Sequence, residues 1–244
     1  MAGEKPRQTR AAPRQLTLEL APKPGYEPEN FFVSQSNEKA YAMVELWPRW
    51  PAPMLMIVGP PGAGKSHMGA IWAAKSGAAT QPGASLANAD IEALAAAGPL
   101  LLEDVDEIGQ AEPQLFHLLN LMRERDIALV LTARALPDTW GLRTADLLSR
   151  LRLAPTIEIG MPDDALMRAV LVKLLIERQL VVDTGVVDYI ALRLERSLEA
   201  ARSFVDRVDR EALARKSRIT RAIASDVLIA IGNEEDPAPA QGPT

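Results

Sequence analysis

Eight consecutive residues fit the pattern G-x-x-x-x-G-K-[ST] at every fixed position. They are Gly59-Pro60-Pro61-Gly62-Ala63-Gly64-Lys65-Ser66. Glycines at these positions let backbone N–H groups close around phosphates at the start of a helix, and a lysine adds a point charge to the β and γ phosphates. The hydroxyl of Ser66 is then in place to ligate Mg²⁺. The pattern predicts a site for ADP or ATP with Mg²⁺, and a chance glycine-rich turn is the alternative.

Two acidic residues, Glu103 and Asp104, follow the apolar run Leu100-Leu101-Leu102. A phosphate loop needs an acid at the end of a neighbouring strand, to hold Mg²⁺ and to orient the attacking water. We expect Glu103 to serve Mg²⁺ and Asp104 to serve the water. In the usual order aspartate comes first, so each carboxylate here is displaced by about one bond length, which is costly to catalysis. We therefore predict nucleotide binding with slow or no intrinsic hydrolysis; a solvated charged turn is the alternative.

Two further residues have types and positions that suit phosphoryl transfer. Thr132 ends the apolar run Ile127–Leu131, where its hydroxyl either contacts the γ-phosphate or the water, or merely ends a strand. Arg150 precedes the last apolar run. In multimeric ATPases an arginine at this place points to a neighbour's nucleotide, where its planar charge stabilises the transferring phosphoryl group. An ordinary surface arginine is the alternative.

Alternating strands and helices must position these residues. Helical patterns, including Lys65–Lys75 and Pro113–Arg125, separate apolar runs that predict strands. Those runs are Met54–Val58, Pro99–Leu102, Ile127–Leu131 and Thr156–Ile159. This alternation predicts an α/β fold in which helices cover a parallel sheet.

After Pro162 the strand signals stop and only helical patterns follow. They lie at about 163–179, 184–194, 197–216 and 220–231, with N-caps expected at Asp163, Asp183, Ser197 and Thr220. We therefore divide the chain into a disordered peptide at 1–24, a nucleotide-binding core at 25–161, a helical domain at 162–232 and a disordered tail at 233–244.

The N-terminal peptide contains Gln15-Leu16-Thr17-Leu18-Glu19-Leu20. In an extended conformation Leu16, Leu18 and Leu20 project to one side and form a short docking strip that begins with the amide of Gln15. An apolar strip without a core of its own needs a partner. The alternative is a strand that packs on this protein's own sheet.

The composition limits the other kinds of site. The chain has 244 residues, 48% of them hydrophobic, with no cysteine and a formal net charge of −5. Without cysteine there is no disulfide or thiolate zinc site, and the isolated His67 and His117 make a poor metal cage. The acidic balance argues against a surface devoted to nucleic acid. Because no long apolar run or signal peptide is evident, we expect no membrane contact and a cytoplasmic location.

Several separate stretches resemble the AAA+ ATPases, within the branch of the replication initiator DnaA. Besides the phosphate loop, they are Glu29–Val33 with Ser36-Asn37, Phe116-His117 with Asn120, Val130–Thr132 with Pro137, and Leu148–Leu151. The resemblance covers roughly residues 26 to 231 and implies an AAA+ P-loop core followed by an all-helical lid. No helix-turn-helix segment follows the lid, and Ala84–Pro99 is too short for the DnaA insertion that contacts single-stranded DNA.

The resemblance also implies roles for residues outside the phosphate loop. Phe32 and Val33 match the segment that lines the adenine pocket, although a buried aromatic beside a valine also suits a plain core. An ungapped alignment places Glu199 where the lid of this family has a phosphate-sensing arginine. Either Arg196 or Arg202 would replace that arginine after a shift of one turn.

Within this branch the chain is similar to regulators of the Hda type, and its N-terminal peptide resembles the motif that docks on the DNA polymerase sliding clamp. The resemblance implies a preference for ADP and two partners, the clamp and DnaA, with DNA reached only through the clamp. It further implies that Arg150 completes the active site of ATP-bound DnaA, so that ATP is hydrolysed and re-initiation is prevented. A homo-oligomer stays open.

Two other functions are compatible with the same residues. One is an autonomous DnaA-like ATPase or loader that remodels a DNA-bound partner, which basic DNA-contacting loops and a standard Asp–Glu pair would favour. The other is a nucleotide-gated interaction module without a catalytic contribution. Arg150 distinguishes this last function from regulation of DnaA.

Overall fold

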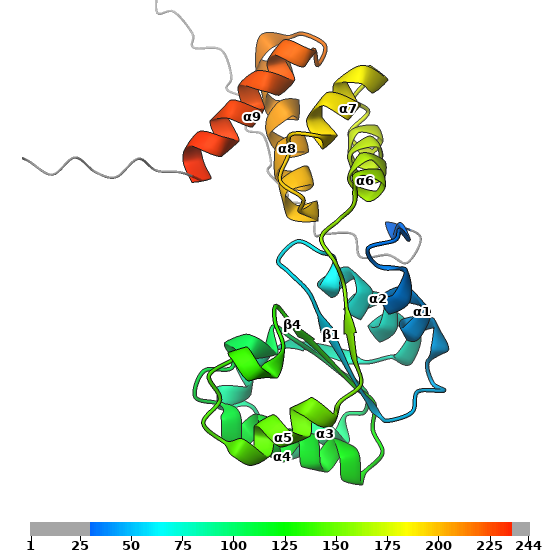
Figure 1. Cartoon of the computed structure of the whole chain (residues 1–244), viewed down its shortest axis with the longest axis vertical. Helices are drawn as coiled ribbons and strands as arrows, with labels where there is room; N and C mark the ends of the chain where they lie inside the picture. Colours follow the sequence, from blue (N-terminus) through cyan, green and yellow to red (C-terminus); the bar gives the residue numbers. More distant parts are fainter. Residues whose placement is uncertain (1–29, 236–244) are drawn as a thin grey trace, which may run out of the picture.

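A parallel five-stranded sheet forms the centre of the computed structural model, which describes residues 30–235. The strand order is β2-β3-β4-β1-β5 (Figure 1). The strands are β1 (Met54–Val58), β2 (Ala79–Pro82), β3 (Leu100–Glu103), β4 (Leu129–Ala133) and β5 (Thr156–Glu158). The predicted α/β class with a parallel sheet is confirmed.

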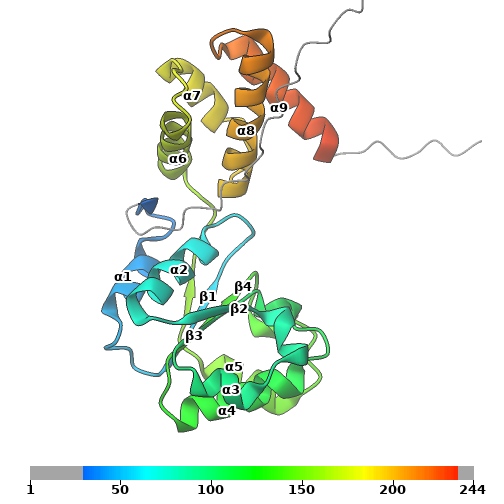
Figure 2. The same ribbon diagram turned by 180° about the vertical axis from the view of Figure 1, so that it is seen from behind.

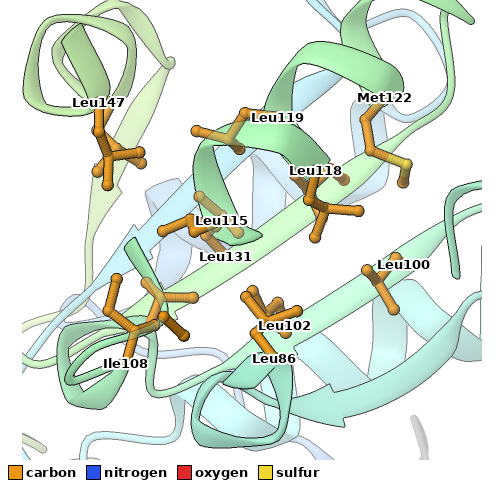
Figure 3. Packing of buried hydrophobic residues seen from close by; sticks show 14 of the residues in the cluster. Leu86, Leu100, Leu102, Ile108, Leu115, Leu118, Leu119, Met122, Leu131 and Leu147 are labelled. Carbon is orange, nitrogen blue, oxygen red and sulfur yellow. The ribbon is translucent and has the colours of Figure 1, made fainter. Parts of the chain in front are cut away.

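Helices cover both faces of this sheet because successive strand residues point to opposite sides. The side chains of Leu55 and Ile57 pack with α1 (Glu38–Leu46) and α2 (Lys65–Ser76) on one face. The opposite face, with Met56, carries the helices α3 (Ile91–Ala96), α4 (Glu112–Glu124) and α5 (Ala145–Leu153). Figure 3 shows that face, where the leucines of α4 meet those of β3 and β4.

Short 3₁₀ helices complete this part of the chain. They are η2 (Gly83–Asn88), η3 (Val105–Glu107) and η4 (Pro137–Thr139). The strand β2 is not predicted from the sequence, because Ala79–Pro82 is mostly exposed as the outermost strand and has no apolar run. The strand β4 begins at Leu129, two residues after its predicted start at Ile127.

Four further helices follow β5 (Figures 1 and 2). They pack around an apolar cluster of their own, in which Phe204 is fully buried. They are α6 (Asp164–Glu177), α7 (Thr184–Ala191), α8 (Leu198–Arg215) and α9 (Arg221–Glu235). We call this four-helix part the lid. Each expected N-cap side chain accepts a hydrogen bond from a backbone N–H of the first turn: Asp163 from Leu166, Asp183 from Gly185, Ser197 from Ala200 and Thr220 from Ile223.

Two predicted segments lie wholly or mostly outside residues 30–235. The predicted docking peptide with Gln15, Leu16, Leu18 and Leu20, and most of the predicted tail, lie outside the described residues. Helix α9 continues to Glu235, past its predicted end at 231. The predicted boundary between the nucleotide-binding core and the helical domain, at residues 161/162, remains a prediction. No helix within residues 30–235 is long and apolar enough to cross a membrane.

The core supports a direct test of packing. Leu118 on α4 is fully buried and Leu213 on α8 is 76% exposed. We expect Leu118→Ala to lower the free energy of unfolding by about 2–5 kcal/mol, because it leaves a cavity under the sheet. The control Leu213→Ala makes the same change of helix propensity at an exposed position, and it should change the free energy of unfolding by less than about 0.5 kcal/mol. Urea denaturation measures both, and equal losses would contradict the assigned core.

Candidate nucleotide-binding site

The phosphate loop begins where β1 ends, and close backbone contacts require its first glycine. The backbone N–H of Gly59 donates to the carbonyl of Ala133, at the end of β4, over 3.1 Å. A Cβ on Gly59 would lie 2.4 Å from the carbonyl oxygen of Ile159. Gly64 caps α2 with φ +102°, a conformation that suits glycine. The sheet therefore holds the start of the loop, and the loop ends in the first turn of α2.

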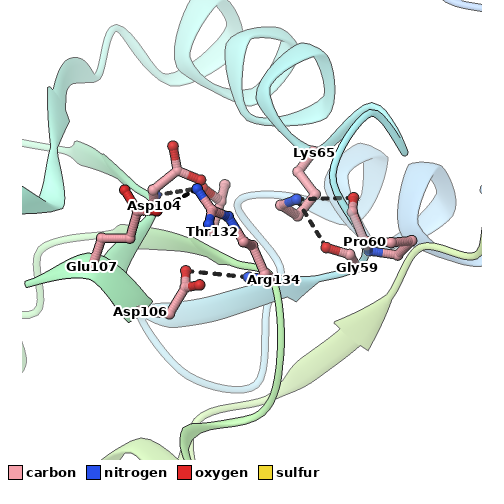
Figure 4. Close-up of polar contacts among 8 residues, drawn as sticks. All are labelled: Gly59, Pro60, Lys65, Asp104, Asp106, Glu107, Thr132 and Arg134. Atoms are coloured by element: carbon pink, nitrogen blue, oxygen red, sulfur yellow. Dashed lines mark hydrogen bonds and ion pairs between the residues drawn. The ribbon is translucent and has the colours of Figure 1, made fainter. Parts of the chain in front are cut away.

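Lys65 lies inside the loop, with its side chain buried (Figure 4). Its Nζ donates to the carbonyl oxygens of Gly59, over 2.8 Å, and Pro60, over 3.1 Å. Burial lowers the pKa of Lys65 below its ordinary value, while the nearby carboxylates of Asp104 and Asp106 oppose this shift. A buried ammonium bound to two neutral carbonyls is well suited to accept a phosphate anion.

Glu103 ends β3 with a buried oxygen. Within residues 30–235 its Oε1 accepts no hydrogen bond. Such an atom is costly to bury unless something satisfies it, and carboxylate oxygens are the donors that Mg²⁺ prefers. The donor set of Ser66 and Glu103 therefore fits Mg²⁺ held with a nucleotide.

Thr132 supports the second acid. Its buried hydroxyl accepts a hydrogen bond from the backbone N–H of Asp104 over 3.0 Å (Figure 4). Asp104 has φ +51°, an uncommon conformation for a residue other than glycine. Thr132 thus fixes the backbone that carries Asp104, which sequence reasoning did not foresee.

Two further charged residues near Lys65 were missed by the sequence analysis. The carboxylate of Asp106 accepts a hydrogen bond from the backbone N–H of Arg134 over 3.2 Å, and the guanidinium of Arg134 pairs with Glu107 (Figure 4). The position of Arg134 two residues after Thr132 was the available signal. These contacts join η3 to the carboxyl end of β4.

The lid lies directly against the phosphate loop. The backbone N–H of Leu198, the first residue of α8, donates to the carbonyl of Gly62 over 2.9 Å. A pocket of about 360 Å³ lies between them. It is lined by Gly62, Gly64, Lys65, Ser66, His67, Leu198, Glu199 and Arg202.

This pocket separates the two arginines that the sequence left open. Arg202 lies one turn beyond Glu199 on α8, and both line the pocket. Arg196 instead pairs with Asp164 over 2.6 Å, and both side chains are more than half exposed. The geometry favours Arg202 as the lid arginine that can reach bound phosphate.

Phe32 and Val33 do not line the pocket beside the phosphate loop. Their exposed fractions are 38% and 52%, and the ring of Phe32 lies 5.9 Å from the Nζ of Lys173 on α6. The aromatic residue that packs near the loop is Phe31, whose ring centroid lies 5.1 Å from that of His67. Phe31 belongs to the same matched stretch, Glu29–Val33. The role of Phe32 and Val33 at an adenine pocket remains a prediction.

Arg150 lies at the amino edge of the sheet, by which we mean the side where the parallel strands begin. The phosphate loop lies at the carboxyl edge, where the strands end. Its guanidinium stands 4.8 Å from the ring centroid of Phe116, and it lines a pocket beside Met54 and Leu129, the first residues of β1 and β4. The phosphate loop follows the other end of β1, and a strand of five residues spans about 17 Å. Arg150 therefore lies about one strand length from the phosphate loop of its own chain.

Comparisons with known proteins show the fold. No protein-family model and no curated protein matches the chain. Domain III of DnaA from Thermotoga maritima is similar with a TM-score of 0.72 and 18% identity, over 85% of this chain and 97% of that one. AMPPCP-bound DnaA from Aquifex aeolicus has a TM-score of 0.63 and 23% identity, over 77% and 66%. The Holliday junction branch migration motor RuvB from Thermotoga maritima has values of 0.65 and 15%, over 85% and 73%. The chain therefore has the fold of DnaA domain III.

The contact between loop and lid can be tested with two glycines. Gly62 (φ +69°) and Gly77 (φ +71°) share a left-handed backbone. A Cβ on Gly62 would lie 2.0 Å from the Oγ and 2.8 Å from the Cβ of Ser197, whereas one on Gly77 meets nothing within 4 Å. We expect Gly62→Ala to displace the lid and to weaken binding of a fluorescent ADP analogue by about tenfold or more. Gly77→Ala should show only the backbone cost, about 1 kcal/mol of stability, with ADP affinity kept. Equal affinities of the two variants would argue against the contact.

Proposed function

We propose that this protein is a nucleotide-bound AAA+ adaptor that docks on the sliding clamp and stimulates ATP hydrolysis by DnaA, and so limits replication initiation. One observation carries the proposal. Arg150 lies at the amino edge of the sheet, while the phosphate loop lies at the carboxyl edge. An arginine so placed can serve a nucleotide only on a neighbouring protein.

The nucleotide site of the chain itself would hold ADP or ATP with Mg²⁺. Lys65 and the backbone N–H groups of the loop bind phosphate, while Ser66 and Glu103 hold the ion, which neutralises phosphate charge when bound. Arg202 approaches the same site from the lid, so a bound nucleotide links loop and lid. Nucleotide binding is thus proposed to stabilise one arrangement of the two parts.

Slow intrinsic hydrolysis follows from the acids. Asp104 has the shorter side chain at the position that polarises water, and its backbone is held by Thr132 in a left-handed conformation. A carboxylate misplaced by about one bond length orients water poorly. An adaptor that keeps its nucleotide needs no rapid turnover, which agrees with the proposed preference for ADP.

In the proposed complex Arg150 acts on DnaA. A planar guanidinium that reaches the transferring phosphoryl group stabilises the charge of the transition state. The ring of Phe116 holds this guanidinium in place through a cation–π contact, which limits the side-chain entropy lost on docking. The chain would therefore supply catalysis in trans.

Docking on the clamp is assigned to the N-terminal residues Gln15, Leu16, Leu18 and Leu20. An extended peptide with alternating leucines suits an apolar cleft. The net charge of −5 agrees with DNA being reached only through the clamp. We propose that the protein acts in the cytoplasm and leave a homo-oligomer open.

A second candidate is an autonomous DnaA-like ATPase or loader. The observation that favours it is that Lys65, Ser66 and Arg202 line one pocket of the same chain. Glu103, at the end of β3, has a buried oxygen for Mg²⁺, so the four residues together could serve hydrolysis in cis. Rapid ATP hydrolysis by the chain alone, without clamp or DnaA, would support this candidate over the adaptor.

The trans role predicts a large effect of one substitution. Arg150→Ala should abolish the stimulation of ATP hydrolysis by DnaA in the presence of DNA-loaded clamp, because an arginine of this kind is worth about 10³–10⁵ in rate. Arg152→Ala is the control: Arg152 lies on the same helix but pairs with Asp138 of its own chain. Unchanged hydrolysis with Arg150→Ala would refute the trans role.

The docking peptide has a separate test. Gln15→Ala combined with Leu18→Ala should lower the affinity for the isolated clamp by about tenfold or more, because both the amide and a central apolar side chain are lost. Thr17→Ala, which changes a residue on the other side of an extended peptide, should keep it. Surface plasmon resonance measures the affinity for the clamp of the unmodified protein, the double variant and Thr17→Ala. Retained affinity of the double variant would remove the docking assignment.

A further inference from the structure

A small apolar pocket opens at the amino edge of the sheet, away from the nucleotide site. Its volume is about 210 Å³, below the range of about 300–1,000 Å³ that small-molecule sites usually have. This size suits one or two side chains of a protein. The apolar lining includes Met54, Leu119, Met122, Ile127, Leu129 and Leu153.

Two arginines stand at this pocket and none of its lining residues is acidic. Arg150 belongs to α5 and Arg123 to α4. Nearby arginines have carboxylate partners: Arg125 pairs with Glu92, and Arg152 with Asp138. Within residues 30–235 neither Arg123 nor Arg150 has such a partner. The rim therefore presents uncompensated positive charge.

Leu153 adds an exposed apolar surface at the mouth. It is 77% exposed and lies one turn from Arg150 on the same helix face. Arginine is enriched in binding hot spots, and exposed apolar surface with a polar rim marks an interaction site. The positive rim calls for a negative group next to an apolar anchor.

We propose that this pocket binds a segment of the protein on which Arg150 acts, in which an apolar side chain stands beside a carboxylate. The apolar side chain enters between Met54, Met122 and Leu153, and the carboxylate pairs with Arg123. Arg150 is thereby left for the partner's nucleotide. This inference rests on the proposed trans role of Arg150. Arg123 and Leu153 then determine the affinity for the partner, and Arg150 determines the rate of ATP hydrolysis.

The division of work is tested by titrating each variant into ATP-bound DnaA with DNA-loaded clamp and following ATP hydrolysis. Arg123→Glu and Leu153→Ser should each raise the half-saturating concentration of this protein about tenfold or more, with the maximal rate unchanged at saturation. The controls carry the same changes at exposed lid positions: Arg218→Glu and Leu213→Ser. Half-saturating concentrations equal to those of the controls would overturn the inference.

Methyl NMR provides a readout that does not depend on catalysis. With ¹³C-methyl methionine, the signals of Met54 and Met122 report on the pocket, and that of Met68, fully buried against the other face of the sheet, is the internal control. Addition of ATP-bound DnaA should shift the signals of Met54 and Met122 and leave that of Met68 in place. The same shifts produced by more copies of this chain alone would overturn the inference in favour of self-association.

The two proposals fail in different ways. If Arg150→Ala leaves hydrolysis unchanged while Met54 and Met122 still shift with DnaA, the trans role is wrong and the pocket remains a docking site. If Arg150→Ala abolishes stimulation while neither methionine shifts and Arg123→Glu behaves as Arg218→Glu, the trans role stands and the pocket inference is overturned.

Discussion

The parallel pairing of β1 with β4 determines which residues meet at each edge of the sheet. Its register sets Met54 opposite Leu129 at one end and Ile57 opposite Thr132 near the other. Because all strands run in the same direction, their carboxyl ends collect the phosphate loop, Glu103 and Thr132 at one edge. The amino ends collect the apolar pocket and Arg150. The candidate nucleotide site and Arg150 thereby lie at two different edges, about one strand length apart.

The contacts between core and lid depend on the same edge. Gly62 accepts the first backbone N–H of α8, and Asp163 both caps α6 and accepts a hydrogen bond from the backbone of Ser36 over 3.4 Å. The hydrogen bond from Leu166 is the main cause that lowers the pKa of Asp163, so this carboxylate is charged at the junction near neutral pH. The lid is consequently held by directional hydrogen bonds at two separate points, to Gly62 of the phosphate loop and to Ser36 ahead of α1.

The proposed function would place nucleotide binding and the catalytic contribution at opposite edges of the sheet. At the carboxyl edge the ammonium of Lys65 is desolvated, and Oε1 of Glu103 accepts no hydrogen bond from residues 30–235, so the proposed nucleotide with Mg²⁺ would stabilise both groups. At the amino edge Arg150 is held by an aromatic ring rather than by an acid, so no ion pair has to be broken before it can act on a neighbour. These two environments agree with the proposal that the protein hydrolyses ATP slowly itself and contributes Arg150 to hydrolysis by a partner.

The sequence alone determined the features that depend on local spacing. The phosphate-loop pattern, the buried strands such as Met54–Val58 and N-caps such as Asp163 and Ser197 could all be predicted, because each is encoded within a few neighbouring residues. Features that depend on contacts between distant segments required the tertiary structure. Sequence could not choose Arg202 over Arg196, because the choice depends on how α8 faces the loop. Nor could it identify the pocket shared by Arg123 and Arg150, since only the packing of α4 against α5 brings these two helices to one edge of the sheet.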